Sequence, residues 1–155
     1  MGIIDIRQAT MYDVPQVRLL EKELIEHERG IELPIKEGDD VYYYDIPQLI
    51  NDATNSHLLV MEHDGEIIAC GLGQIRENKH YYTEKYFGYV GLMSVKKEYR
   101  GRGYGRDIIN LLLQWFKTKN ITEVKLKVFA NNPGAIKAYR KLGFEDFSID
   151  MRVEI

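Results

Sequence analysis

The chain has 155 residues but a single cysteine, and this scarcity limits the chemistry that it can perform. One thiol cannot form an internal disulfide, so the sequence fits a reducing compartment. Cys70 lies in the apolar run IIACG, where a buried small side chain is expected rather than a nucleophile. None of the four histidines has the spacing of metal ligands, so we predict no metal site.

Long apolar runs are also absent. No stretch is long enough for a transmembrane helix, and the N-terminus lacks the charged-then-apolar pattern of a secretory signal. These absences predict a cytoplasmic protein without a membrane partner. Apolar residues make up 45% of the chain and charged residues 29%, as in ordinary globular proteins. We expect a single domain over residues 1–155, long enough to enclose a proper core.

Charge is distributed unevenly around a net value of −3. Residues 21–45 contain nine acidic and three basic side chains, whereas residues 95–141 contain twelve basic and three acidic ones. Ordinary surface charge explains much of this. The pattern also suits an anionic cofactor in the second half and a cationic acceptor near the first. Because the chain contains no known nucleic-acid-binding module and is negative overall, we expect no nucleic-acid partner.

The order of apolar patterns predicts strands first and alternating strands and helices later. Strands are expected at 3–8, 57–62, 66–76, 87–95, 124–129 and 144–153, with a hairpin turn at Asp64-Gly65. Helices are expected from a start at Thr10-x-x-Asp13 to about Gly30, at 46–53, at 107–118, and over about ten residues from Pro133. Residues 31–45 are expected to form a loop. This order favours an α/β fold with a sheet of mixed direction.

A glycine-rich turn stands between one of these strands and a helix. Residues 95–106 read VKKEYRGRGYGR. Glycines let backbone N–H groups approach a phosphate closely, the helix N-terminus adds partial positive charge, and arginines suit the same anion. The spacing fits neither the Walker loop nor the dinucleotide fingerprint, since Arg106 stands where each needs another residue. A flexible basic turn is the alternative for this segment alone.

A second segment has the features of a short capped helix. Residues 131–144 read NNPGAIKAYRKLGF. Asn132 is a suitable N-cap, Pro133 suits the first helical position, and Gly143 suits a left-handed C-cap. Tyr139 lies seven residues after Asn132, which is about two turns, so both fall on one face of the helix.

Together the two segments resemble the motifs of the GNAT family, whose members transfer an acetyl group from acetyl-CoA to an amine. The family's pyrophosphate motif, Arg/Gln-x-x-Gly-x-Gly/Ala, is matched by Arg100, Gly103 and Gly105. Its later motif, Asn-x-x-Ala-x-x-x-Tyr followed by Gly-Phe, is matched by Asn132, Ala135, Tyr139, Gly143 and Phe144. The resemblance implies the GNAT fold, an α/β fold with a mixed central sheet of about six to seven strands flanked by about four helices.

The resemblance also implies a cofactor site and a reaction. Acetyl-CoA would be the acyl donor, and its acetyl group would pass directly to the amine through a tetrahedral intermediate. The residues implied in cofactor binding are Met93, Ser94, Val95, Arg100, Gly101, Arg102, Gly103, Tyr104, Gly105, Arg106, Asn132 and Ala135. Tyr139 occupies the position of the catalytic acid that protonates the departing thiolate.

The chain departs from the family in two places. Some members have a glutamate base about eleven residues before the motif's first residue, but here that position is Tyr89. Glu28, His27, Glu84, His80 or a water relay are the alternatives. Only eleven residues follow Phe144, where many members have a two-stranded hairpin. The acceptor wall is then either open or completed by the second subunit of a homodimer.

Two other readings of the function stay open at this point. The same fold can use another acyl-CoA or acylate a protein amine rather than a small one. A non-catalytic CoA-binding sensor or scaffold is the alternative from another class. Tyr139 argues against that second reading, and the missing glutamate at position 89 argues mildly for it.

Overall fold

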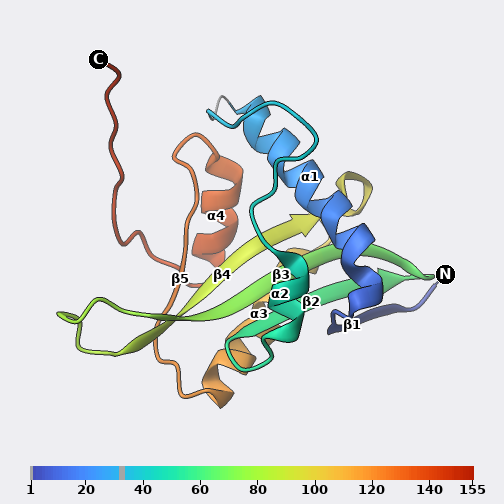
Figure 1. Cartoon of the computed structure of the whole chain (residues 1–155), viewed down its shortest axis with the longest axis horizontal. Helices are drawn as coiled ribbons and strands as arrows, with labels where there is room; N and C mark the ends of the chain where they lie inside the picture. Colours follow the sequence, from blue (N-terminus) through green and yellow to red (C-terminus); the bar gives the residue numbers. More distant parts are fainter. Residues whose placement is uncertain (1, 32–33) are drawn as a thin grey trace.

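The computed structural model describes residues 2–31 and 34–155, and a mixed sheet forms its centre (Figure 1). Its five strands lie in sequence order: β1 (Ile4–Gln8), β2 (Ser56–His63), β3 (Glu66–Glu77), β4 (Tyr86–Val95) and β5 (Val124–Leu126). The first four strands pair antiparallel, and β5 joins β4 in parallel. The mixed direction expected from the sequence is confirmed, whereas the expected six to seven strands are too many.

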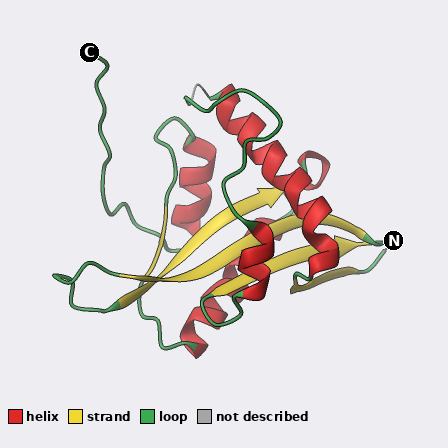
Figure 2. Cartoon of the chain, in the orientation of Figure 1, coloured by secondary structure: helices red, strands yellow, loops and turns green. Residues whose placement is uncertain are grey.

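Four α-helices surround the sheet, as expected (Figure 2). They are α1 (Val14–Gly30), α2 (Ile46–Asn51), α3 (Tyr104–Thr118) and α4 (Pro133–Lys141). Two short 3-10 helices, Met11–Asp13 and Lys97–Tyr99, precede α1 and follow β4. Helices α1 and α2 cover one face of the sheet, and α3 covers the other (Figure 1).

Each covered face has its own apolar core. On the α3 side, Ile108, Leu112 and Phe116 recur every four residues and are almost completely buried. Glycine in the sheet lets this helix approach closely, because a Cβ on Gly88 would lie 2.7 Å from the Phe116 ring. On the other side, α1 contributes Leu20 to a second core that includes residues of α2, β2 and β3.

Local signals in the sequence explain two of the connections. Asp64 and Gly65 both have positive φ angles, 51° and 80°, as a two-residue hairpin turn requires. The entry to α1 depends on Asp13, which accepts a 2.7 Å hydrogen bond from the Thr10 backbone N–H. Asp13 also receives two hydrogen bonds from the Arg7 guanidinium, at 2.8 and 2.9 Å, and this pair ties β1 to the helix.

The structure corrects three of the expected boundaries. Helix α3 begins three residues earlier than expected, and β5 ends at Leu126 rather than residue 129. The strand expected at 144–153 does not form, although its residues alternate between apolar and polar. A strand needs a neighbour for its backbone hydrogen bonds, and β5 is too short to offer one over this length. Of the expected loop 31–45, residues 32 and 33 lie outside the described part.

Cys70 is completely buried, and burial raises the pKa of its thiol to about 12. A thiol with such a pKa stays protonated at neutral pH, which excludes an activated nucleophile. The described residues include no group of three or more His, Cys, Asp or Glu side chains that could hold a metal ion. No helix within 2–31 and 34–155 combines the length and the apolar character needed to cross a membrane.

Candidate active site

The glycine-rich turn lies where β4 passes through the 3-10 helix Lys97–Tyr99 into α3. Gly101 and Gly103 have left-handed φ angles of 78° and 84°, which residues with a Cβ rarely adopt. Gly103 is the N-cap of α3 and has no side chain to cap the first N–H groups. These N–H groups, at the positive end of the helix dipole, are therefore available to an anion.

Gly105 differs from the other two glycines of the turn. It lies in the first turn of α3 without a positive φ angle, so its backbone does not require glycine. The nearest atom to a Cβ built on it is Cγ2 of Val95, at 4.0 Å. The protein itself leaves this space open, beside the end of β4. A closely approaching phosphate would account for a small residue here.

The three arginines of the turn are exposed and partly engaged with it. Nε of Arg100 donates to the Val95 carbonyl at 2.9 Å, and Nη2 of Arg102 donates to the Glu98 carbonyl at 3.1 Å. Arg106 forms an ion pair with the carboxylate of the next residue. A guanidinium has five N–H donors, so these contacts leave others for an anion. The arginines thus brace the turn and surround it with positive charge.

A β-bulge interrupts β4 before the turn. Leu92 has a φ angle of 49°, and the register between β3 and β4 shifts at this point. Val90 packs in the core on the α3 side, whereas Leu92 packs in the core on the α1 side. Strict alternation would put both side chains on one face, so the sequence pattern could not reveal the bulge. The bulge turns the backbone groups of β4 away from a regular ladder.

One edge of β4 is uncovered next to the bulge, because β5 pairs with only three of its residues while β4 continues to Val95. The side chains predicted to bind the cofactor here point elsewhere. Met93 packs in the core on the α3 side, and Oγ of Ser94 donates to the Leu20 carbonyl at 3.1 Å. These residues can therefore offer a ligand their backbone groups rather than the Met93 and Ser94 side chains.

Helix α4 begins and ends as the sequence predicts. Asn132 is the N-cap, and its side-chain oxygen accepts a 3.4 Å hydrogen bond from the Ala135 N–H. Gly143 follows the helix with a φ angle of 97°. The side-chain oxygen of Asn132 is thus engaged in capping, which fixes the direction in which α4 carries Tyr139.

Tyr139 is half-buried near the end of α4. Its ring packs edge-to-face on Phe144, with centroids 6.0 Å apart. Its hydroxyl makes no hydrogen bond within the described residues, and it is not among their buried unpaired polar atoms. Burial raises the pKa of Tyr139, and the nearby Tyr89 and Glu28 raise it further. The side chain is therefore a protonated donor at neutral pH.

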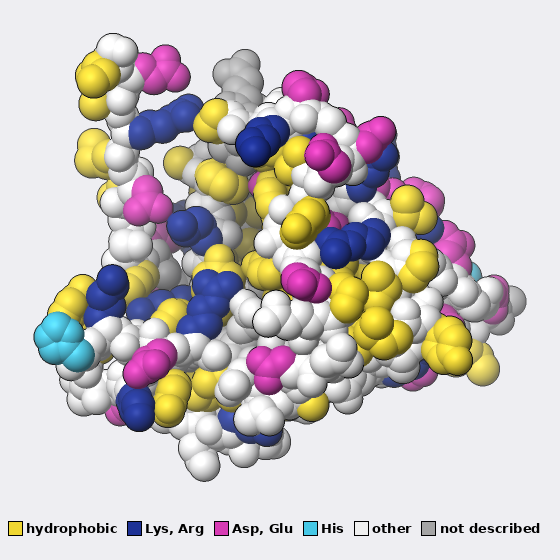
Figure 3. Space-filling view, viewed as in Figure 1, with side chains coloured by type: hydrophobic (Ala, Val, Ile, Leu, Met, Phe, Trp, Pro, Cys, Tyr) yellow, Lys and Arg dark blue, Asp and Glu magenta, His cyan; other side chains and the backbone are white. Residues whose placement is uncertain are grey.

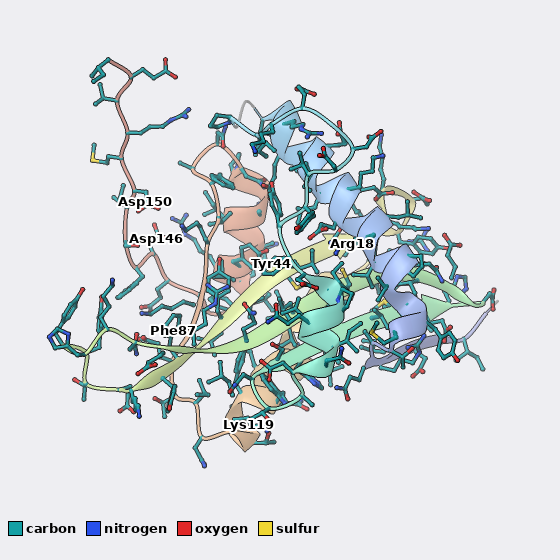
Figure 4. The ribbon with its side chains drawn as sticks, in the orientation of Figure 1. Arg18, Tyr44, Phe87, Lys119, Asp146 and Asp150 are labelled. Carbon is teal, nitrogen blue, oxygen red and sulfur yellow. The ribbon has the colours of Figure 1, made fainter. Side chains whose placement is uncertain are left out.

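Tyr139 belongs to a tyrosine cluster that also contains Tyr44 and Tyr89. The pKa of Tyr44 is raised by burial and then by Tyr89, the same neighbour that affects Tyr139. Tyr44 lies in front of β4 (Figure 4), and its hydroxyl occupies the space that a Cβ on Gly91 would need. The Arg76 guanidinium lies over the Tyr89 ring, 3.7 Å from its centroid. Tyr44 packs against the core on the α1 side, whereas Tyr139 packs against the core on the α3 side.

Glu28, at the end of α1, is the base candidate that the structure brings to the tyrosine cluster. It is half-buried, and its Oε2 accepts a 2.5 Å hydrogen bond from the Tyr43 hydroxyl. Its charge also raises the pKa of Tyr139, after burial and Tyr89, so the two groups lie within electrostatic range of each other. The other candidates from the sequence are exposed: His27, His80 and Glu84.

Sequence reasoning missed the residue that orders this region, Glu21. Its carboxylate is buried and accepts hydrogen bonds from the backbone N–H groups of Tyr43 and Tyr44, at 3.1 and 3.0 Å. Arg18 completes the arrangement with a 3.0 Å ion pair. The one signal in the sequence was that Glu21 lies four residues after Val17, on the apolar face of α1. Glu21 thereby holds two tyrosines against the site.

The acidic segment 21–45 divides into two parts in space. Asp39 pairs with Lys22 at 2.9 Å, and this ion pair lowers the pKa of the Asp39 carboxyl. Asp39 and Asp40 line a shallow hollow that also contains Arg18 and Lys22. The charge of Asp39 is therefore compensated locally, whereas Glu28 accepts a hydrogen bond from the Tyr43 hydroxyl.

Comparison with known proteins identifies the same elements. The model of the acetyltransferase (GNAT) family matches residues 20–144. A mycothiol acetyltransferase of Corynebacterium aurimucosum is 41% identical over 58 residues, which are 37% of this chain and 19% of that protein. The N-alpha-acetyltransferase MAK3 of Arabidopsis thaliana is 30% identical over 77 residues, which are 50% of this chain and 37% of that protein.

A solved structure extends the similarity in fold to the whole chain. The aminoglycoside N-acetyltransferase AAC(6')-Iy, in complex with CoA, superposes with a TM-score of 0.80. The alignment covers 100% of this chain and 96% of that one, at 20% sequence identity. The fold is therefore shared, while the curated relatives match over 19 to 38% of their own lengths.

Proposed function

Because the chain belongs to the GNAT acetyltransferase family, we propose that it transfers the acetyl group of acetyl-CoA directly to an amine. The observation that carries the proposal is the continuous path from the open edge of β4 to the N-terminus of α3, with Tyr139 beside it. Anion-binding N–H groups at the start of α3 and backbone groups along β4 thus follow one another in the order that the pyrophosphate, the pantetheine arm and the thioester of a bound cofactor need.

The cofactor would bind along this path. Its pyrophosphate would lie on the turn 100–106, and its pantetheine arm would follow the backbone of residues 93–95. Support comes from the uncapped N–H groups after Gly103 and from the open space beside Gly105. The thioester carbonyl would then reach the bulge at Leu92, whose backbone N–H groups can stabilise the oxyanion of the tetrahedral intermediate.

The attacking amine must first lose a proton. An alkyl ammonium with a pKa of about 10.4 is neutral in roughly one molecule in 2,500 at pH 7, a deficit of about 4.6 kcal/mol. We assign the role of acceptor-side base to Glu28, because it is half-buried and its charge contributes to the raised pKa of Tyr139. Tyr43, which donates to Glu28, holds the carboxylate in place.

The transfer of the acetyl group that follows is balanced in atoms and protons. The amine nitrogen bonds to the carbonyl carbon, the carbon–sulfur bond breaks, and the Tyr139 hydroxyl gives its proton to the departing sulfur. The nitrogen's second proton replaces the one that Tyr139 lost. Overall, an ammonium and acetyl-CoA yield an N-acetylated amine, free CoA thiol and one released proton.

The acceptor is proposed to be cationic before it reacts, as in an amino sugar, a polyamine or a basic peptide. Glu28 supports this, because a carboxylate beside the reacting position attracts an ammonium and can then receive its proton. The sequence had grouped Asp39 and Asp40 with Glu28. The ion pair of Asp39 with Lys22, and the place of Asp40 in the same hollow as Arg18 and Lys22, remove them from the argument.

Release of free thiol from acetyl-CoA, measured across a panel of amines, tests the activity. Glu28→Gln should lower kcat/KM for alkyl amines about 10²-fold or more, and the loss should shrink for amines of lower pKa, which need less help in losing a proton. Asp39→Asn is the matched control and should behave as the unsubstituted protein. An equal loss for all amines would remove Glu28 as the base, and a panel without any turnover would leave a CoA-binding module.

A peptide N-terminus is the second candidate acceptor. The similarity to an N-alpha-acetyltransferase over half of this chain favours it. The two acceptor classes separate in the same assay when short peptides with free α-amino groups are compared with polyamines and amino sugars. Greater kcat/KM for the peptides would select this candidate.

A further inference from the structure

Residues 145–155 are the part of the structure that the proposed reaction does not use. They form no strand or helix, and all of them are exposed. Five of them have large apolar side chains, whose relative exposures are 65% for Phe147, 86% for Ile149, 91% for Met151, 84% for Val153 and 118% for Ile155. So many exposed apolar side chains on consecutive alternate positions mark an interaction surface.

The same residues have the sequence pattern of a half-buried strand. From position 147 the chain reads FSIDMRVEI, in which apolar and polar residues alternate without exception. An extended backbone would put every apolar side chain on one face and Ser148, Asp150, Arg152 and Glu154 on the other. The segment therefore has a strand's pattern but lacks a strand's partner within the described residues.

Few contacts hold the segment to its own chain. A bidentate ion pair between Arg140 and Asp146 fixes its start, at 3.2 and 2.6 Å. Farther along, Asp150 lies 3.8 Å from Lys127, and both side chains are exposed, so this pair adds less than about 1 kcal/mol. The segment leaves the body beside β5 (Figure 1), where Nζ of Lys125 lies over the Phe147 ring, 4.9 Å from its centroid. Beyond this contact the segment extends away from the body (Figure 3).

We propose that residues 147–155 pair antiparallel with the same residues of a second copy of this chain, in a register centred on Met151. The two copies would be related by a two-fold axis through that position. The reason for choosing a second copy is that the segment is complementary to itself. Each strand of this ribbon would be about 30 Å long.

The charged side chains favour this register over the alternative registers nearby. With Met151 opposite its own copy, Asp150 stands opposite Arg152 on both sides of the axis, and Ile149 stands opposite Val153. A register centred on Asp150 would put two aspartates opposite each other, and one centred on Arg152 would put two arginines together. Registers shifted by one residue would bring apolar side chains opposite polar ones.

The pairing would supply what each copy lacks. It satisfies backbone hydrogen-bonding groups along nine residues and gathers ten apolar side chains on one face of the ribbon. A ribbon of two strands is only marginally stable alone, so we expect a dimer that dissociates on dilution. The dimer stands apart from the proposed acetyl transfer, since the segment contributes no residue to the site.

Charge exchange tests the register. Asp150→Arg places two arginines opposite each other, and Arg152→Asp places two acids opposite each other. Each variant alone should sediment as a monomer at concentrations where the unsubstituted chain is a dimer. An equimolar mixture of the two should form heterodimers, and the doubly exchanged variant should form homodimers, because both restore opposite charges.

Cysteine cross-linking tests the same register independently. Met151→Cys should form a disulfide-linked dimer on mild oxidation, since the two sulfurs would face each other across the axis. Ser148→Cys is the matched control, because its copies would lie about 20 Å apart; adding Glu154→Cys should restore cross-linking. The native Cys70 is completely buried and does not interfere.

Three results would overturn the proposal. The first is an unsubstituted chain that stays monomeric up to millimolar concentration. The second is a mixture of the two charge variants that stays monomeric, and the third is Ser148→Cys cross-linking as fast as Met151→Cys. Thiol release from acetyl-CoA, measured on the monomeric variants, reports separately on the proposed function.

Discussion

At the scale of single residues, Tyr139 differs from the other tyrosines of the chain in its environment. The chain has ten other tyrosines. Tyr139 combines an unengaged hydroxyl with a half-buried ring and a place next to Tyr89 and Glu28. Burial raises the pKa of the phenol, so it remains a donor throughout the neutral range. Position in the helix motif predicted this residue, and the packing explains why its proton is retained.

Tyr139→Phe should lower kcat at least about a hundredfold, because the ring keeps its packing while the proton donor is lost. The free energy of unfolding should change by less than about 1 kcal/mol, since the hydroxyl makes no hydrogen bond within the described residues. The dissociation constant of acetyl-CoA should move less than about threefold. Steady-state kinetics, thermal unfolding and calorimetry measure the three quantities.

Tyr12→Phe is the control for this substitution, because Tyr12 is 94% exposed in the 3-10 helix before α1. A near-normal kcat for Tyr139→Phe would have two explanations, which single-turnover kinetics separates. Slow chemistry in a single turnover would show that product release had hidden the effect. Normal chemistry there would remove Tyr139 from the mechanism.

At the scale of elements, the glycine turn contains two kinds of glycine. Gly101 and Gly103 are required by the backbone, since both have left-handed φ angles, and a Cβ on Gly103 would also lie 2.8 Å from Arg106. Substituting either one strains the turn before any ligand binds. Gly105 has an ordinary backbone conformation and open space around it. A substitution of Gly105 therefore tests cofactor binding without straining the folded turn.

Gly105→Val should therefore reduce acetyl-CoA affinity at least tenfold, or more than about 1.4 kcal/mol, while the fold remains intact. The branched side chain would fill the space between α3 and the end of β4 where the phosphate is expected. Gly134→Ala is the control: it lies in the first turn of α4 with no atom within 4 Å of its Cβ. It should leave affinity unchanged and stabilise the chain by about 0.5–1 kcal/mol. Unchanged affinity of folded Gly105→Val would contradict the phosphate assignment.

The junction of β1 and α1 predicts a dependence of stability on pH. The Arg7 guanidinium, then the Thr10 backbone N–H, hold the pKa of the Asp13 carboxyl below its usual value, against the effect of burial. Stabilisation by Asp13 is then complete above the unfolded pKa of about 3.9 and is lost as pH falls through the lower folded pKa. Asp13→Asn should cost about 1–3 kcal/mol at pH 7.

Urea unfolding of both proteins between pH 7 and pH 2.5 measures this effect. The difference between them should be constant above about pH 5 and should narrow below about pH 4, as the native carboxyl becomes protonated. Asp5→Asn is the control for a general change in charge, because Asp5 is exposed on β1 and forms no ion pair within the described residues. A difference that is independent of pH would show that packing, not ionisation, gives Asp13 its effect.

Elements that are set by nearby residues could be predicted from the sequence. Elements that depend on pairing with a distant segment could not. The cap at Asn132, the hairpin at Asp64-Gly65 and the start of α1 each follow from nearby residues. The bulge at Leu92 has no local signal, because it arises from the pairing of β3 with β4. The expected strand at 144–153 has a correct pattern, but a pattern cannot supply a hydrogen-bonding neighbour.

At the scale of the whole molecule, the chain order predicted the family fold, while the acceptor side had to be read from the structure. The two motifs lie at the start of α3 and along α4, in the order that the family resemblance implied. Glu28 and Tyr44 come from the first 45 residues, and only the fold brings Glu28 within electrostatic range of Tyr139 and Tyr44 to Gly91 of β4. Glu21 shows the same limit, because a buried carboxylate in a helix looks like any other acid in the sequence.

The charge asymmetry of the molecule gives a last prediction, for the binding of the cofactor. The exposed arginines of the turn 100–106 surround the proposed pyrophosphate site, and CoA is strongly anionic. Salt shortens the range of such attraction, from about 10 Å at 0.1 M to about 3 Å at 1 M. The dissociation constant of acetyl-CoA should therefore rise steadily between 0.05 and 1 M sodium chloride.

Calorimetric titrations of acetyl-CoA at several salt concentrations measure this slope. Arg102→Gln removes one exposed charge of the turn and should flatten the slope, because fewer ions are displaced when the cofactor binds. Lys117→Gln, in the last turn of α3, changes the net charge equally but lies at the far end of the helix, and should leave the slope unchanged. Equal slopes for all three proteins would mean that the basic excess of residues 95–141 is solvated surface without a role in binding.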